Sequence, residues 1–208
     1  MTTPAATVVA LSRQMGSGGS HVGQAIADAR GLRYIDEAML RDASHYLLTH
    51  DPSLREVPAR MDTWWSTMAG ALAMGGMGGL GVLPVETAQE AETARIERRI
   101  IEEVAGHHPS VLISEEASHA LHGRPGVLTV YLHAPESWRI DRVAHGRGLT
   151  PDQARDAVRH SDRHRAALVR ALTGADCTDV RQYDLAIDTA AIGLETAVDL
   201  VLRLVKPE

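Results

Sequence analysis

The sequence predicts an α/β protein built on a doubly wound, five-stranded parallel sheet. Short apolar runs typical of buried strands alternate along the chain with longer amphipathic stretches that have helical spacing. A chain of 208 residues is long enough to bury the core of one such domain. Only 3% of the residues are aromatic and none is phenylalanine, so the core is expected to be aliphatic.

The first apolar run passes directly into a cluster of glycines. The run covers residues 7–11, the cluster follows, and apolar residues recur at helical spacing from Val22 onward. A turn between a strand and a helix offers free backbone N–H groups at the positive end of the helix dipole, which favours phosphate. A glycine-rich turn without a ligand is the alternative. The residues expected to bind a nucleotide here are Gly16, Ser17, Gly18, Gly19, Ser20 and His21.

This glycine cluster departs from the usual phosphate-loop pattern, Gly-x-x-x-x-Gly-Lys-Ser/Thr. Alignment on Gly18 and Ser20 places Arg13 at the first glycine and Gly19 at the lysine, so the ammonium that bridges the outer phosphates is missing. The guanidinium of Arg13 can supply positive charge and bind phosphate oxygens in bidentate fashion. The hydroxyl of Ser20 is the expected Mg²⁺ ligand.

Residues 33–36 are predicted to form a second strand that ends in the carboxylate of Asp36. At the carboxyl edge of an α/β sheet this side chain would face the ligand crevice and contact the phosphate acceptor. Asp is also a favoured N-cap, so Asp36 can instead cap the helix expected over 37–50, which ends before Pro52.

Residues 50–90 are expected to form an insert on the substrate side. The pair Trp64 and Trp65 can stack on a base, but packing or an interface is the preferred interpretation. No charged residue occurs between Thr63 and Val85, and 74–81 is rich in glycine and methionine. These glycines disfavour a helix, so no stable membrane insertion is expected, and the segment is interpreted as an adaptable loop or as the contact surface of a homodimer.

The remaining elements alternate regularly, as right-handed crossovers in a parallel sheet require. Helices are expected at 86–106, shortly after Glu115 and Glu116, and from Ala134. Two further helices are expected within 150–173, and a closing helix at 194–205. The three remaining strands are expected at 111–113, 127–132 and 183–188.

Composition narrows the classes of function. A formal charge of −6 and a pI near 6.0 argue against general nucleic-acid binding, which needs a net basic surface. A single cysteine, Cys177, excludes an intrachain disulfide and is interpreted as an ordinary thiol in a reducing compartment. The first residues carry no basic region typical of a secretory signal, so a cytoplasmic location is expected.

Several motifs together resemble the cytidylate kinase-like family, relatives of the nucleoside monophosphate kinases with a P-loop and a three-layer fold. The resemblance covers most of the chain except roughly 50–90. It implies phosphoryl transfer from ATP, with Mg²⁺, to a nucleotide-like acceptor. The glycine loop is similar to the family's own Ser-Arg-x-x-Gly-Ser-Gly-Gly pattern, which also has no lysine. Five motifs carry the resemblance. They are residues 12–19; residues 34–36; residues 133–135 together with Arg139 and Arg142; residues 162–165 together with 173–174; and residues 183–185 together with 188–189 and Gly193.

Under this resemblance the chain is one domain, 1–208, with a mobile helical lid at 145–175. Cations from Arg13 and from three lid arginines, Arg139, Arg142 and Arg165, would converge on the transferred phosphoryl group. Asp162 would orient a lid arginine close to the substrate. The alternative for each lid arginine is a solvated helix face or a surface ion pair.

One departure from the family affects the third strand. The family usually shows a Gly-Arg pair after this strand, whereas here Glu115 and Glu116 follow. Two acids beside a phosphate site reverse the local electrostatics, which indicates a different acceptor or a catalytically silent nucleotide-binding module. Glu115 is a candidate acceptor contact, and either acid can hold Mg²⁺ through water. Two weaker alternatives are metal sites formed by the acids with His119 and His122, or by His160 and His164.

Overall fold

The chain divides into two compact units. The computed structural model describes residues 6–50, 88–174 and 176–206. One unit comprises residues 1–37 and 102–208, and the other comprises 38–101. The second unit contains most of α2 (Glu37–His50) and most of α4 (Ala88–His107). Within α2 the hydroxyl of Ser44 donates a 2.8 Å hydrogen bond to the Leu40 carbonyl.

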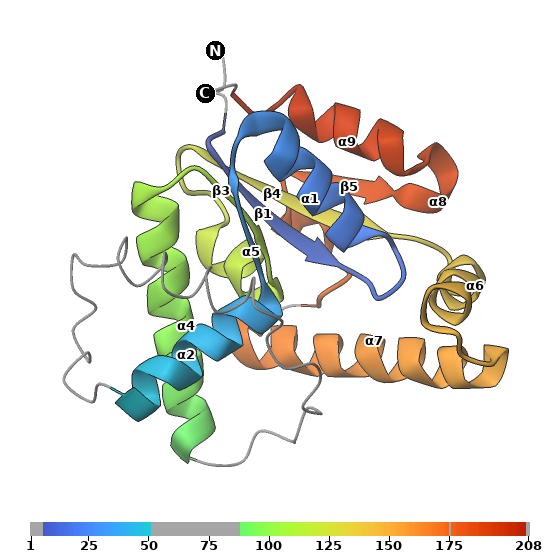
Figure 1. Ribbon diagram of the computed structural model, residues 1–208, viewed down its shortest axis with the longest axis horizontal. Helices are drawn as coiled ribbons and strands as arrows, with labels where there is room; N and C mark the ends of the chain where they lie inside the picture. Colours follow the sequence, from blue (N-terminus) through green and yellow to red (C-terminus); the bar gives the residue numbers. More distant parts are fainter. Residues whose placement is uncertain (1–5, 51–87, 175, 207–208) are drawn as a thin grey trace. The chain divides into compact units, whose positions relative to one another are not determined.

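The first unit is built on a five-stranded, all-parallel sheet in the order β2-β3-β1-β4-β5, which confirms the predicted fold class (Figure 1). Its middle strand β1 pairs with β3 on one side and β4 on the other, in the registers Leu11 with Ile113 and Leu11 with Val130. The loop after β1 therefore leaves from the centre of the sheet. The strands are β1 (Val8–Arg13), β2 (Arg33–Asp36), β3 (Ser110–Ile113), β4 (Val127–His133) and β5 (Leu185–Asp188).

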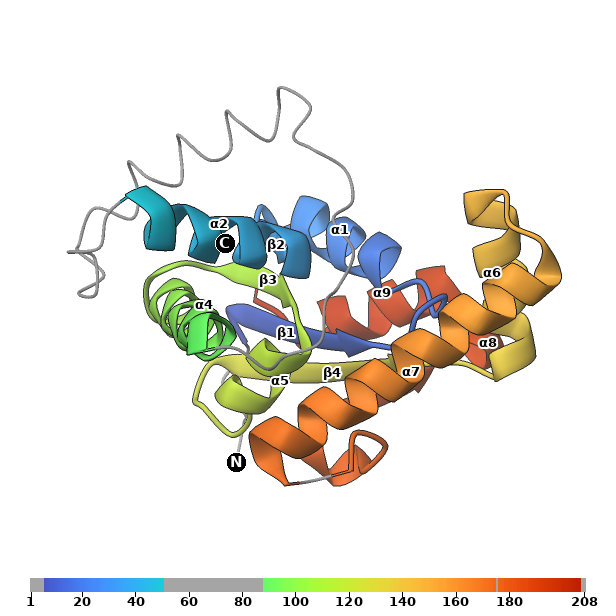
Figure 2. The same cartoon turned by 90° about the horizontal axis from the view of Figure 1, so that it is seen from below.

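Helices cover both faces of this sheet. On one face α1 (Gly19–Arg30) and α9 (Leu194–Leu202) pack their apolar sides on the strands, with Val22, Ile26 and Val201 fully buried (Figure 2). On the other face α5 (Glu115–Leu121) lies against β1, and part of α7 (Pro151–Thr173) lies against α5. The core is aliphatic, as expected from the scarcity of aromatic residues.

The stretch 150–173 forms one helix, α7, so the prediction of two helices there was wrong. A capping box between Thr150 and Gln153 starts α7, and Gly174 in the left-handed conformation ends it. No glycine and no internal proline interrupts the stretch between these signals. The helix α6 (Glu136–Arg147) precedes it and packs on it through Ile140, Val143, Ala154 and Val158.

Two short elements were not predicted. The 3₁₀ helix η2 (Val180–Gln182) precedes β5, and α8 (Thr189–Ile192) follows it. The carboxylate of Asp188 caps α8 by accepting from the amides of Ala190 and Ala191.

The insert predicted at 50–90 lies almost entirely outside the described residues. Trp64, Trp65 and the glycine- and methionine-rich segment 70–83 belong to it, so their roles stay predictions. None of the described helices has the length and apolar composition needed to span a bilayer.

Candidate nucleotide-binding site

A tight loop follows the middle strand β1, and hydrogen bonds within the loop and to β4 fix its backbone. The amide of Gln14 donates to the Leu132 carbonyl at 3.0 Å, which ties the loop to β4. The amide and the hydroxyl of Ser17 both donate to the Gln14 carbonyl, at 3.1 and 2.8 Å. Ser17 is fully buried, and its amide and hydroxyl shape the loop, whereas the sequence analysis expected it among the residues that bind the nucleotide.

The glycines of this loop are required by its geometry. Gly16 and Gly18 have φ values of 86° and 87°, in the left-handed region that other residues rarely adopt. A Cβ at Gly16 would lie 2.7 Å from the backbone oxygen of Arg139, and one at Gly18 would lie 2.4 Å from a methyl carbon of Leu194. The loop therefore packs directly against α6 and α9.

The amino end of α1 offers backbone donors that have no partner in the part of the chain that the structure describes. The helix begins at Gly19, and its N-cap Gly18 provides no side chain to accept from the first turn. The amides of Gly19, Ser20 and His21 have no intrahelical acceptor, because the first helical bond runs from Val22 to Gly18. A helix terminus in this state favours an anion, as the glycine cluster predicted.

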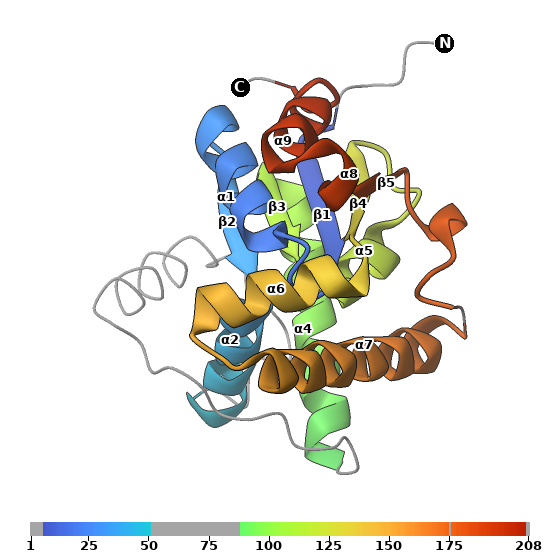
Figure 3. The ribbon, with the colours of Figure 1, turned by 90° about the vertical axis from the view of Figure 1, so that its right-hand side faces the viewer.

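This terminus opens onto a cavity of about 550 Å³ that lies within the first unit. Helix α6 lies across the loop (Figure 3), and its residues Arg142, Val143, Gly146 and Arg147 line the cavity. Four of the predicted site residues, Ser17, Asp36, Arg139 and Asp162, do not line the cavity. The predicted residues that do line it are Arg13, Gly16, Gly18, Gly19, Ser20, His21, Glu115, Arg142 and Arg165.

Arg139 is buried and holds the loop in place. Its guanidinium makes two hydrogen bonds with the carboxylate of Asp162, at 3.0 and 2.8 Å, and donates to the carbonyls of Met15 and Ala134. Only 3% of Arg139 is exposed. Arg139 therefore connects α6, α7 and the loop through these hydrogen bonds.

Arg142 lies three residues further along α6 and points to the cavity. Its Nε donates to the carbonyl of Gly16 at 3.2 Å, and its guanidinium lies 4.8 Å from the centre of the Trp138 ring. The terminal nitrogens of Arg142 have no acceptor among the described residues, and neither do the side chains of Arg13 and Arg147. Three guanidinium groups with donors to spare therefore line the cavity.

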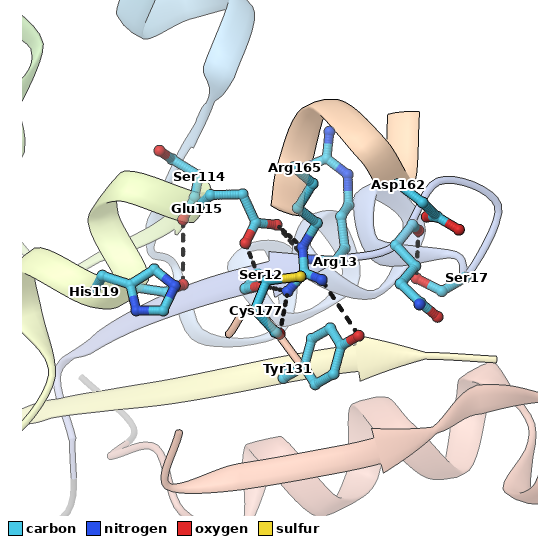
Figure 4. A network of polar contacts seen from close by, with 12 residues as sticks. Ser12, Arg13, Ser17, Ser114, Glu115, His119, Tyr131, Asp162, Arg165 and Cys177 are labelled. Carbon is cyan, nitrogen blue, oxygen red and sulfur yellow. Dashed lines mark hydrogen bonds and ion pairs between the residues drawn. The ribbon is translucent and has the colours of Figure 1, made fainter. Parts of the chain in front are cut away.

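Arg165 is the fourth arginine in the lining, but its guanidinium is already engaged (Figure 4). Its Nε lies 2.8 Å from Oε1 of Glu115, and the two side chains are only 7% and 12% exposed. Its Nη2 donates to the hydroxyl of Ser12 at 2.9 Å and to Tyr183, and its Nη1 donates to Tyr131. Burial alone would lower the pKa of Arg165, but the attraction of Glu115 outweighs it and raises the pKa.

The hydroxyl groups around Arg165 form a buried layer beneath it. The rings of Tyr131 and Tyr183 stack with their centres 5.0 Å apart, and the guanidinium lies 4.5 Å from the centre of the Tyr131 ring. Burial raises the pKa of Tyr183 to about 12, although its hydrogen bond with Ser12 acts in the opposite direction. Burial also raises the pKa of Tyr131, so both phenols are neutral at physiological pH and serve as hydrogen-bond partners of the arginine.

The carboxylates expected at the acceptor side differ in their surroundings. Both oxygens of Glu115 are used, since Oε2 accepts from Ser12 at 2.7 Å and Oε1 from the amide of Arg13 at 3.1 Å. Asp36 ends β2 outside the cavity lining, whereas Glu37, the next residue, lines the cavity. The described residues contain no group of three or more His, Cys, Asp or Glu side chains arranged to hold a metal ion. This finding contradicts the two metal sites suggested with His119 and His122 and with His160 and His164.

Sequence reasoning missed several residues of this site. Arg147 lines the cavity from α6, and Ser114 lines it from the end of β3. His164, which the sequence analysis named only as part of a metal-binding pair, lines it from α7. Thr189 holds the loop from beneath, because its buried hydroxyl contacts the carbonyls of Ser17 and His133 at 2.8 and 3.2 Å. The signal available for Arg147 was its place five residues after Arg142, on a helix already expected at the site.

Comparison with known proteins places this loop and sheet in a family. The model of the cytidylate kinase-like family matches residues 8–191, from the first residue of β1 to α8. The chain belongs to this family. The match includes the glycine loop, the cavity lining and the Arg139–Asp162 pair, so the site lies within the part of the chain that the family shares.

Individual relatives are distant. A curated cytidylate kinase from Methanopyrus kandleri is 24% identical over 57% of this chain and 63% of its own length. A solved structure of an uncharacterized protein from Eubacterium ventriosum has a TM-score of 0.68 at 16% identity, over 94% of this chain and 96% of that one. A gluconokinase from Sinorhizobium meliloti has a TM-score of 0.50 at 20% identity, over 98% and 95%. These structures show a shared P-loop kinase fold.

Proposed function

We propose that this protein transfers the terminal phosphoryl group of ATP to a nucleoside monophosphate or a similar small acceptor. The observation that carries the proposal is the uncapped amino end of α1, whose free amides open onto a cavity with three partly unpaired arginines. Membership of the cytidylate kinase-like family supports the same class of reaction. The curated relative is named a cytidylate kinase, which makes CMP the first acceptor to test.

Phosphoryl transfer needs in-line positioning and neutralisation of charge more than covalent chemistry. In this proposal the amides of Gly16 and of 18–21 hold the donor phosphates, and Arg13 replaces the missing lysine. Arg142 is fixed by its bond to the Gly16 carbonyl, which places its free nitrogens beside the same oxygens. Arg139 and Arg165 would act indirectly, by fixing the walls of the cavity.

The residues present also fit a magnesium ion. Ser20 lies in the first turn of α1 and lines the cavity, so its hydroxyl would hold Mg²⁺ beside the donor phosphates. Glu115 is a weaker candidate ligand, because both of its oxygens already accept hydrogen bonds or an ion pair from the protein. When bound, Mg²⁺ would neutralise charge on the phosphates.

A catalytically silent nucleotide-binding module is the second candidate. Two of the four arginines expected at the phosphates, Arg139 and Arg165, are buried and paired with carboxylates. This observation favours binding without transfer. Such a module would bind ATP and transfer phosphate to no acceptor, and the contact surface of its expected homodimer would include the insert outside the described residues.

Calorimetry and a phosphate-transfer assay test the proposal together. ATP with Mg²⁺ is titrated into the protein, and transfer is then measured with CMP, dCMP, UMP and AMP. Arg142→Ala should weaken ATP binding by about 1.5–3 kcal/mol, or roughly 10- to 150-fold, because one charge-assisted contact is lost.

Arg155→Ala provides the matched control, since Arg155 is a surface residue of α7 that pairs with Asp152 and does not line the cavity. It should bind ATP as the wild-type protein does. Binding of ATP without transfer to any acceptor would favour the silent module. Absence of ATP binding by the wild-type protein would contradict both candidates.

A further inference from the structure

Glu115 connects three elements that are distant in sequence. It begins α5 just after β3, and its carboxylate contacts Arg165 of α7 at 2.8 Å. The same carboxylate accepts from the Ser12 hydroxyl at 2.7 Å and from the Arg13 amide at 3.1 Å. Ser12 and Arg13 are the last residues of β1, where the strand passes into the glycine loop.

These contacts leave neither charged group available to a ligand. Each of the three guanidinium nitrogens of Arg165 contacts a protein oxygen, and the residue is 6% exposed. Both carboxylate oxygens of Glu115 are likewise occupied, and its side chain is 12% exposed. The pair thus contributes little net charge to the cavity, although both residues line it.

The contacts of Glu115 fix the point from which the loop starts. The Arg13 amide is the last donor of β1, and Gln14, the next residue, is tied to β4 through the Leu132 carbonyl. The Ser17 amide then closes the turn on the Gln14 carbonyl. The amides of Arg13, Gln14 and Ser17 are therefore each held by a hydrogen bond, the first of them by Glu115. These three bonds fix the backbone between the end of β1 and the free amides of α1.

We propose that Glu115 is a positioning residue that holds the glycine loop in its anion-binding shape before any ligand arrives. Arg165 serves it as a fixed counter-charge, so the loop, α5 and α7 are locked together by one buried ion pair. The effect of Glu115 on the shape of the loop does not depend on the proposed function. Its consequence, tighter binding of the donor triphosphate, rests on the proposed function.

Amide hydrogen exchange of the ligand-free protein tests this role. Glu115→Gln removes the charge while keeping the side-chain shape, so the amides of Arg13, Gln14 and Ser17 should exchange about tenfold faster or more. The amides of α9 should keep the wild-type rate. Glu136→Gln is the matched control, because Glu136 pairs with Arg159 on the surface of α6 and α7, and it should leave the loop unchanged.

Two results would overturn the inference: loop exchange at the wild-type rate in Glu115→Gln, or an equal increase in the loop and in α9. If Glu115→Gln does not fold, the double variant Glu115→Gln/Arg165→Gln leaves no unpaired charge, and the same local increase is expected in it.

Calorimetry with inorganic tripolyphosphate separates this inference from the proposed function. The double variant Glu115→Gln/Arg165→Gln leaves the net charge of the cavity unchanged and should bind the probe about tenfold more weakly than the wild-type protein, whereas Glu136→Gln should bind it equally well. A wild-type protein that does not bind tripolyphosphate would contradict the proposed function, whereas the exchange rates would still decide the role of Glu115. Wild-type affinity in this double variant would contradict the inference alone.

Discussion

Replacement of Arg165 by methionine should lower the free energy of unfolding by about 3–5 kcal/mol, as measured by urea denaturation. Methionine keeps much of the volume but leaves the Glu115 carboxylate buried without its counter-charge, which is the costly way to break a buried ion pair. It also removes the donors to the hydroxyls of Ser12, Tyr131 and Tyr183. A loss of this size is a large part of the stability of a typical domain.

Arg159→Met is the matched control for this prediction. Arg159 also pairs with a glutamate, Glu136, at 2.9 Å, but the two side chains are 54% and 43% exposed. Such a surface pair should contribute less than about 1 kcal/mol. The double variant Glu115→Gln/Arg165→Met should regain part of the loss, since no charge is left unpaired. Equal effects of Arg165→Met and Arg159→Met would show that the buried pair has no special part in the fold.

Replacement of Gly16 by alanine should also destabilise the protein, by about 2–5 kcal/mol in the same measurement. The left-handed conformation of Gly16 costs an alanine about 1–2 kcal/mol. Its Cβ would in addition lie 2.7 Å from the backbone oxygen of Arg139, and relief of this contact requires α6 or the loop to move, at about 1–3 kcal/mol.

Gly148→Ala separates the two contributions. Gly148 ends α6 with a φ of 63°, and apart from its own chain neighbours no atom of the described residues lies within 4 Å of the position that its Cβ would take. This variant should therefore show only the conformational cost of about 1–2 kcal/mol. If Gly16→Ala and Gly148→Ala are equally destabilising, the loop does not pack on α6 as closely as the structure shows.

The sheet and the loop could be predicted because their signals are local. Each strand is a short apolar run, and the cluster at 16–19 marks the turn that follows the first of them. The continuity of α7 was missed although nothing after Pro151 breaks the helix before the capping residue Gly174.

The roles of the arginines depend on contacts that local patterns do not reveal. Arg139 and Arg142 were both expected at the transferred phosphoryl group, but a spacing of three residues on the helix separates them enough for Arg139 to be buried while Arg142 lines the cavity. The sequence indicated that Glu115 would reverse the local charge. Its neutralisation by Arg165, 50 residues later, requires the folded chain to bring α5 and α7 together.

The central claim is that backbone amides at the start of α1 hold the phosphates of ATP, and amide NMR spectra test it most directly. When ATP and Mg²⁺ are titrated into the protein, the amide signals of Gly16, Gly18, Gly19, Ser20 and His21 should shift and reach saturation together. The amide signals in the middle of α9 should stay in place. Spectra in which the loop signals do not move, or in which saturable shifts occur only outside the loop and the cavity lining, would contradict the account.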